Sequence, residues 1–375
     1  MSPTTRHEES IAAALYVSLE LGGTTWLVVS TTGVGQRPRR TKVRAGDTTA
    51  LATEIARARA RFHLAAAAPV DSCYEAGGDG FWLHRWLVAQ GVQNVIVDSA
   101  SIRVRRRRRE AKTDRLDAEA LVGMLIRSVG REGHVWSVVH VPTPEAEDRR
   151  QLNREWESVK ADRKRVRNRI GSLLATQGIR RVLPHDLVAT LSVMRTGDGR
   201  ALGPLLQARL VRECAHLAAV EERCATLAAV RQQIRTGDDP ISECARRLIA
   251  VKGVGDVGAE MLSAELFASR AFHNGRELGA LVGLVPTPYR SDQKMQEQGH
   301  SRAGRGALRG VMTQLAWGWL RFQPHSALAQ WFHARFATGP RLRRIGIIAV
   351  ARKLLIALWH YVAHGIVPEG ATLRA

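Results

Sequence analysis

The sequence predicts an α/β domain near the N-terminus, two long helices after it, and a mainly α C-terminal domain. Three observations support this prediction. Short β-prone runs alternate with helical segments in the first part of the chain. A long charged stretch then repeats apolar residues every three, four or seven positions. The last part consists of helix-forming runs interrupted by glycines. We expect these three parts to cover residues 11–143, 144–240 and 241–370.

The first part begins with two β-prone runs, IAAALYVSLE and TTWLVVST, within residues 11–32. Gly22-Gly23 lies between them, which favours a hairpin. Further strands are expected at residues 36–44, 69–75, 94–98 and 136–141, and helices at residues 48–64, 79–90 and 114–128. An initial hairpin followed by alternating helices and strands predicts a sheet with both parallel and antiparallel pairs.

Two long amphipathic helices are expected after Pro142 and Pro144. Their apolar positions are Leu152, Trp156, Val159, Val166, Ile170 and Leu173 in the first helix, and Leu210, Cys214, Leu217, Cys224, Leu227 and Ile234 in the second. Heptad-like spacing around a middle segment with Gly197 and Gly199 favours an antiparallel coiled coil that serves as a spacer or oligomerisation element. A plain helical bundle fits the same pattern equally well.

The C-terminal part contains the run Gly253-Val254-Gly255, followed by Gly258-Ala259. This pattern is similar to a helix-hairpin-helix, in which backbone N–H groups of a tight turn bind a phosphate. A helical pair that only packs, without a ligand, is the alternative. Helical segments are expected from Arg305 to His364.

The composition points to a polyanionic partner. The formal net charge is +21, and 49 of the 56 basic residues are Arg, whose guanidinium binds phosphates in a bidentate manner. None of the four cysteines belongs to a CxxC pair, so structural zinc is not expected. We find no secretory signal, no apolar run long enough to cross a membrane and no clear basic amphipathic helix. We therefore expect a soluble, intracellular protein without a membrane partner.

Two aspartates, Asp114 and Asp117, directly follow the basic run RVRRRRR. At a spacing of three residues both carboxylates project from one side of a helix. Acids kept beside a phosphate-binding surface indicate a cation site, because Mg²⁺ prefers oxygen ligands. The alternative is a solvated first helical turn, where acids suit the helix dipole.

Glu20 and Glu75 end the first and fourth predicted strands. If these strands are neighbours, the two acids converge and the following helix brings Asp114 and Asp117 above them. Ribonuclease H-like nucleases hold two divalent ions in this way and use them on one phosphodiester. Other acids that could take part are Asp71, Asp79, Asp98 and Glu119.

Three runs, YVSLELGGTTW, CYEAGGDGFWLHRWL and KTDRLDAEALV, resemble in order and spacing the N-terminal domain of the DEDD transposases of the insertion sequence 110 family. The resemblance implies a ribonuclease H-like (RuvC-like) fold in which Glu20, Glu75, Asp114 and Asp117 bind Mg²⁺, or Mn²⁺ in its place. The first acid of the family is normally Asp. Glu20 is one methylene longer, which shifts the geometry of the cation site.

The segments RLIAVKGVGDVGAEML, FHNGRELGALVGLVPTPYRSDQKMQEQGHSRAGRGALRG and AVARKLLIALW resemble the transposase domain of the same family. The resemblance implies that Ser291 is a nucleophile that forms a covalent phosphoserine with DNA. The family commonly has Gly where this chain has Asp292. Ser301 is the second candidate, in a position more typical of a phosphate contact. The residues alone indicate only a serine in a polar loop, with no recognisable His/Asp partner.

Basic residues beside both candidate sites are expected to bind nucleic-acid phosphates, and solvated charges are the alternative. They are Arg105, Arg107, Arg109 and Lys112 in the first part and Arg302, Arg305 and Arg309 in the last. The resemblance implies a bacterial, nucleoid-associated DNA recombinase with three partners: double-stranded DNA of element ends and target, a guide (bridge) RNA, and further copies of the chain in a dimer or tetramer. A junction-resolving nuclease that uses water, or a non-catalytic nucleic-acid-binding relative, are the alternative functions.

Overall fold

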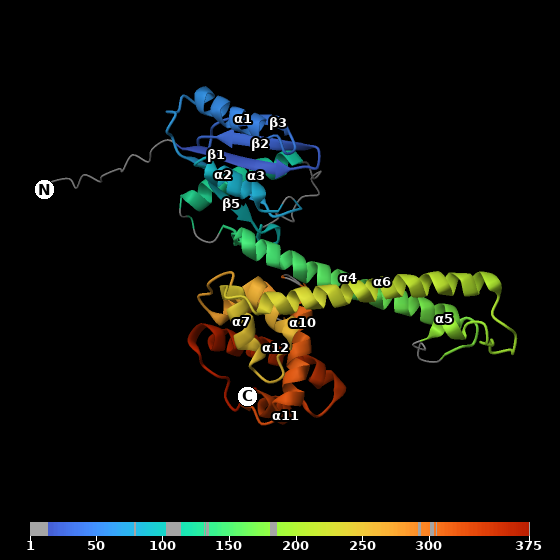
Figure 1. The fold of residues 1–375 in the computed structure, drawn as a ribbon. Coiled ribbons are helices and arrows are strands. Elements are labelled where there is room, and N and C mark those ends of the chain that lie inside the picture. Colours follow the sequence, from blue (N-terminus) through green and yellow to red (C-terminus); the bar gives the residue numbers. More distant parts are fainter. Residues whose placement is uncertain are drawn as a thin grey trace. The chain divides into compact units, whose positions relative to one another are not determined.

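The computed structural model divides into two compact units, residues 1–141 and 142–375, and each is described by itself (Figure 1). The structure describes residues 14–78, 80–102, 114–130, 132, 135–180, 186–291, 294–300, 304 and 306–374. The side chains of residues 100, 114–115 and 286–300 lie outside this description. The expected division into three domains stays a prediction.

Unit 1 is built on a mixed five-stranded sheet in the order β3-β2-β1-β4-β5. The strands are β1 (Leu15–Leu21), β2 (Thr25–Thr31), β3 (Arg39–Arg44), β4 (Val70–Glu75) and β5 (Gln93–Val97). The pairs β1–β2 and β2–β3 are antiparallel, whereas β1–β4 and β4–β5 are parallel. The predicted hairpin and the predicted mixture of parallel and antiparallel pairs are both confirmed.

The prediction of a strand at residues 136–141 is wrong. This segment forms an isolated antiparallel bridge between Val138 and Val97 of β5. The Asp98 N–H donates to the carbonyl oxygen of Ser137, and the Val139 N–H donates to that of Ile96. These two bonds close one bridge, and no further pair with β5 extends it into a ladder within the described residues.

Three helices cover the two faces of this sheet: α1 (Thr48–Arg61), α2 (Trp82–Ala89) and α3 (Asp114–Val129). Alternation along the strands divides the buried side chains between the faces. One face contributes Leu15, Val17 and Leu19 of β1 to a core with α1 and α2. The other face packs against α3, where Val29 meets Ala118 and Val122. All three helices were expected from the sequence.

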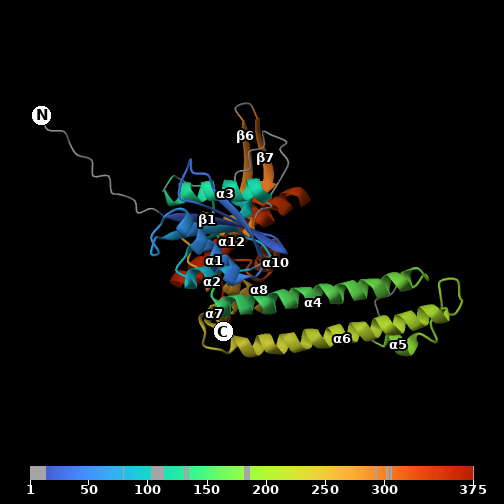
Figure 2. The ribbon, with the colours of Figure 1, turned by 90° about the horizontal axis from the view of Figure 1, so that it is seen from above.

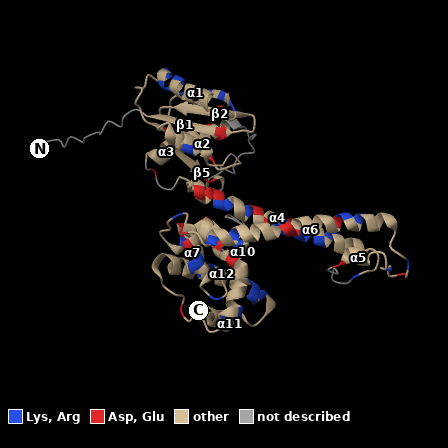
Figure 3. Ribbon diagram, in the orientation of Figure 1, with Lys and Arg blue, Asp and Glu red and all other residues tan. Residues whose placement is uncertain are grey.

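Unit 2 begins with an arm made of two long helices, α4 (Pro144–Ala175) and α6 (Pro204–Arg235), with the short α5 (Leu187–Thr190) between them. The long helices lie side by side and antiparallel in both views (Figures 1 and 2). Val159 of α4 packs with Leu227 of α6, and Ile170 packs with Leu210. Both helices contain acidic and basic residues along their length (Figure 3). The two predicted helices are therefore present, and their apolar stripes face each other.

The rest of unit 2 is mainly helical, as expected. Its elements are α7 (Pro240–Ile249), α8 (Asp256–Leu262), a π-helix (Ser263–Phe267), α9 (Gly275–Val282), α10 (Gly306–Phe322), α11 (Ala327–Phe336) and α12 (Pro340–His364). They share one apolar core. Two strands, β6 (Pro286–Ser291) and β7 (Lys294–His300), form an antiparallel hairpin that the sequence did not predict.

Among the helices that the structure describes, α12 alone has the length and composition of a membrane span, with a mean hydropathy of 1.6 over its most apolar window. Leu354, Leu355 and Leu358 are fully buried in the core of unit 2. Burial within the unit explains the apolar side chains on this part of α12, and 44% of its most apolar window is buried there.

Candidate functional site

Glu20 and Glu75 lie beside each other on neighbouring parallel strands. The register of β1 and β4 pairs Ser18 with Cys73 and Leu19 with Tyr74, and the next residues in the two strands are Glu20 and Glu75. Paired positions in a sheet place their side chains on the same face. The structure therefore brings together two acids that the sequence analysis singled out separately.

The face that carries these acids is the one covered by α3. Ser18, two residues before Glu20, donates a hydrogen bond through Oγ to the carbonyl oxygen of Ala118 at 2.6 Å. Cys73, two residues before Glu75, contacts the carbonyl oxygen of Leu121, with Sγ at 3.8 Å. Because side chains alternate along a strand, Glu20 and Glu75 point to the α3 side.

The direction of α3 places its first turn at the acid end of the sheet. Ala118 lies over Ser18, whereas Leu125, two turns later, lines a pocket with Asp71 at the beginning of β4. The helix thus begins near the C-terminal ends of β1 and β4. Its first turn contains Asp114 and Asp117.

Asp117 is half-buried and stands one turn before Leu121, so it shares the sheet-facing side of α3. Asp114 is the first residue of the helix, and its side chain lies outside the described part. Among the side chains that the structure describes, no three His, Cys, Asp or Glu residues lie close enough to hold one metal ion. The four-acid metal site therefore stays a prediction that depends on Asp114.

The other acids named from the sequence have different positions. Glu119 forms an ion pair with Arg40 of β3 at 2.5 Å. Asp71 lies at the start of β4, the opposite end of the strand from Glu75. Asp98 follows β5 and is exposed near the end where Glu75 lies. Asp79 lies outside the described residues.

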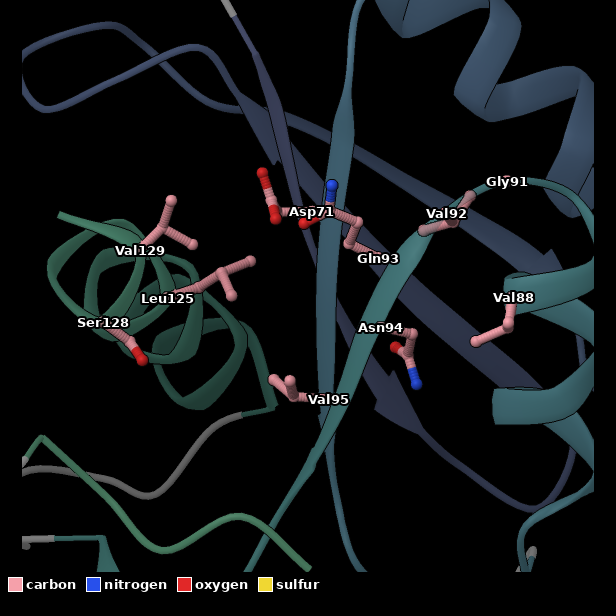
Figure 4. A pocket seen from close by; sticks show the side chains of 10 residues that line it. All are labelled: Asp71, Val88, Gly91, Val92, Gln93, Asn94, Val95, Leu125, Ser128 and Val129. Carbon is pink, nitrogen blue, oxygen red and sulfur yellow. The ribbon is translucent and has the colours of Figure 1, made fainter. Parts of the chain in front are cut away.

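A pocket of about 530 Å³ opens at the start of β4 and β5, between α2 and α3 (Figure 4). Asp71 lines it together with mainly apolar side chains such as Val92 and Leu125. Burial raises the pKa of Asp71. Because this pocket lies at the other end of β4 from Glu75, it is not part of the acid site.

Ser291 is the last residue of β6, and its backbone pairs with Lys294 of β7. The sequence suggested a polar loop, and the structure instead places this serine at the end of a strand. The two strands pair with each other along their length (Figure 2). Its side chain, Asp292 and Ser301 lie outside the description.

Of the basic residues predicted to bind nucleic acid, the structure describes Arg309, which is half-buried in α10. The other predicted residues, Arg105, Arg107, Arg109, Lys112, Arg302 and Arg305, lie outside the described residues. Their roles remain predictions.

The glycine pattern of the expected helix-hairpin-helix has a packing explanation. Gly253 has φ +94°, and a side chain there would press on Phe322 of α10 at 3.3 Å. A Cβ at Gly258 would lie 3.0 Å from the Leu315 side chain. The first turn of α8 contains Asp256, an acid that opposes phosphate binding. These contacts favour the alternative in which the pair only packs.

Sequence analysis did not single out the basic residues of β3, although it expected the strand. Arg40, Lys42 and Arg44 alternate along it and are exposed. Their period of two was a visible signal for a common face. Only the cross-strand register shows that this is the face of Glu20 and Glu75.

Comparison with known proteins places these features in context. Residues 245–330 match the family model described as "Transposase IS116/IS110/IS902 family". A protein of Sinorhizobium fredii (strain NBRC 101917 / NGR234) named "Putative transposase y4rJ" is 41% identical over 96% of this chain and 95% of its own length. "Transposase for insertion sequence element IS1328" of Yersinia enterocolitica is 24% identical over 68% of this chain and 73% of its own length.

Proposed function

The chain belongs to the IS116/IS110/IS902 family of insertion-sequence transposases, which are enzymes of DNA phosphoryl transfer, and we propose that it cuts and rejoins DNA through a metal-assisted serine. Unit 1 supplies the carboxylates and unit 2 supplies Ser291. The observation that carries the proposal is the register that sets Glu20 beside Glu75, with the first turn of α3 at the same end of the sheet.

The strand order β3-β2-β1-β4-β5, with its antiparallel first three strands, supports a ribonuclease H-like fold for unit 1. In such a fold, acids at the ends of the first and fourth strands hold divalent ions. Glu20, Glu75, Asp114 and Asp117 offer only carboxylate oxygens, which suit Mg²⁺ and also Mn²⁺. A bound ion would stabilise the charge that develops on the phosphate.

Ser291 is proposed to attack the phosphorus atom of one DNA strand. The Oγ–P bond forms as the P–O bond to one sugar breaks, and the hydroxyl proton leaves as the strand end departs as an alcohol. The resulting phosphoserine is again a phosphodiester, so a second strand end can displace Oγ without an external energy source. A serine hydroxyl is a weak nucleophile while it is protonated, so it needs a base or a metal ion to activate it.

Double-stranded DNA of the element ends and of the target is the proposed substrate. The composition, with 49 arginines, supports binding of a polyanion but does not identify a sequence. We further propose that a structured guide RNA selects the target and that a dimer or tetramer brings Ser291 of one copy to the acids of another. The paired helices α4 and α6 are the proposed assembly element.

The first test uses Ser291→Ala with Ser301→Ala as the matched control. Protein, the RNA transcribed beside the gene, DNA carrying the element ends, and Mg²⁺ are mixed, and covalent protein–DNA adducts are isolated under denaturing conditions. We expect Ser291→Ala to lose the adduct and strand cleavage together, while Ser301→Ala retains both. Mass spectrometry of the wild-type adduct should place the phosphate on Ser291.

Glu75→Gln tests the carboxylates in the same assay, because it removes the charge with little change in shape. We expect the cleavage rate to fall by more than about a hundredfold. Mutation of residues that only hydrogen-bond to metal ligands already lowers metal affinity or activity by about 10- to 100-fold, and Glu75 is a proposed ligand itself. DNA binding should remain. Cleavage by Ser291→Ala at the wild-type rate would instead show a nuclease that uses water, and wild-type protein that binds DNA without cutting it would show a non-catalytic relative.

A further inference from the structure

The edge strand β3 carries a charged surface that the proposed function does not use. Arg40, Lys42 and Arg44 alternate along the strand, and all three are exposed. The residues between them face the other side of the sheet, where Arg39 pairs with the buried Glu54 at 2.5 Å. The strand period of two therefore gathers three basic side chains on a single face.

The sheet register connects this basic face to the acids. Lys42 lies opposite Leu27 of β2, and Leu27 lies opposite Glu20 of β1. One row across the sheet therefore runs through Lys42, Leu27, Glu20 and Glu75. Neighbouring strands are about 4.8 Å apart, so two spacings put the backbone of Lys42 about 10 Å from that of Glu20. Arg44 lies two residues further toward the acid end.

The three basic residues differ in their partners. Arg40 is held by Glu119 of α3 in an ion pair of 2.5 Å. Lys42 and Arg44 form no ion pair with any acid in the described ranges. Charged residues on edge strands also prevent pairing with other sheets. Protection of the edge explains why β3 carries charged residues. It does not explain why Lys42 lies in the same row of the sheet as Glu20 and Glu75.

We propose that Lys42 and Arg44 bind the phosphodiester backbone of the DNA strand whose reacting phosphate lies at Glu20 and Glu75. This inference rests on the proposed function of the acids. A backbone offset of about 10 Å, two strand spacings, suits contact with phosphates next to the reacting one along the same strand. The two carboxylates repel the DNA backbone, and the flanking cations offset that repulsion. Such contacts fix the path of the strand without reading its sequence.

The test compares two double variants of the full-length protein. Lys42→Gln/Arg44→Gln removes the proposed contacts, and Arg57→Gln/Arg61→Gln removes the same charge from α1, which packs on the opposite face. Binding to a fluorescent DNA duplex is measured at several salt concentrations. Each phosphate contact contributes about 0.9 to the slope of log affinity against log salt. We expect the slope to fall by about two in the first variant and to stay unchanged in the second.

Single-turnover cleavage at saturating DNA separates this inference from the proposed function. Lys42→Gln/Arg44→Gln should keep measurable cleavage once saturated and show the lower salt slope, whereas Glu75→Gln should lose cleavage and keep the wild-type salt slope. A wild-type slope in soluble Lys42→Gln/Arg44→Gln overturns the inference. If the double variant aggregates, Lys42→Gln alone takes its place, with an expected fall in slope of about one. Normal cleavage by Glu75→Gln would defeat the proposed function of the acids without affecting the binding result.

Discussion

Glu54 shows how a buried charge is held in unit 1. Arg39 Nε donates to its carboxylate at 2.5 Å, and Thr41 Oγ1 donates at 3.0 Å. Burial raises the pKa of Glu54, but these hydrogen bonds and the positive charges of Arg39 and Arg57 outweigh it, so the pKa is lowered. The ionised form is therefore the one that the fold stabilises.

Glu54→Gln should make unit 1 less stable above about pH 4.5, the ordinary pKa of Glu. Hydrogen bonds to charged groups contribute about 1.5–3 kcal/mol, so we expect a loss near the lower end because Arg39 is partly exposed. A lowered pKa contributes stability above its unfolded value and loses it as the pH falls through the folded value. The difference between wild type and variant should thus shrink below pH 4.5 in urea unfolding curves.

The matched control for Glu54 is Glu132, which pairs with Arg127 at 2.6 Å on the surface of the same unit. Both side chains are more than half exposed. Exposed ion pairs contribute about 0.2–1 kcal/mol or nothing. Glu132→Gln should therefore leave the unfolding curve almost unchanged, and an equal loss in both variants would contradict the role of burial at Glu54.

At the scale of elements, ion pairs fix the arm to the C-terminal helices. The arginines come from α4 and α6, and the acids come from α8, the π-helix and the residue before α7. The pairs are Arg149–Asp239, Arg150–Glu265, Arg231–Glu260 and Arg235–Asp256. Arg150 and Glu265 are both buried, so loss of either one would leave an uncompensated charge. Part of the arginine content is thus structural and does not indicate nucleic acid.

The contact between α11 and α12 depends on Gly346. A Cβ at this position would lie 2.7 Å from Phe336 Cβ and 2.9 Å from Phe332 Cε2. Gly346→Ala should therefore destabilise unit 2 by about 1–3 kcal/mol, the usual cost of overpacking.

The matched control is Gly171 in α4, where no atom lies within 4 Å of an added Cβ. Gly171→Ala should stabilise the same unit by up to about 1 kcal/mol, because Ala favours a helix. Thermal unfolding of both variants provides the measurement, and a stabilised Gly346→Ala protein would contradict this packing.

At the scale of the whole molecule, the two units have separate apolar cores. The sheet core with α1 and α2 lies within residues 1–141, and the core of α7 to α12 lies within residues 142–375. Domains with their own cores commonly unfold as separate cooperative units. We expect two transitions in calorimetry of the full-length chain. Glu54→Gln should shift one transition and Gly346→Ala the other, and a common shift of a single transition would show one cooperative unit.

Regular periodicity allowed the sequence to predict much of the secondary structure. The Gly22-Gly23 hairpin, the strand that ends at Glu75 and the two long helices of unit 2 are all present. The sequence did not predict the β6–β7 hairpin, because its polar run PTPYRSDQKMQEQGH has no apolar alternation. It also predicted a strand at residues 136–141, where the structure has only an isolated bridge between Val138 and Val97.

The sequence by itself identified the candidate acids, the basic composition and the family resemblance, and comparison with relatives confirmed that resemblance. The tertiary structure decided which of these residues share a face. Side chains alternate along each strand, and hydrogen bonding between strands sets the register, so a shift of one residue would send Glu20 or Lys42 to the opposite side. That pairing between distant segments is a property of the folded sheet, and no local pattern in the chain specifies it.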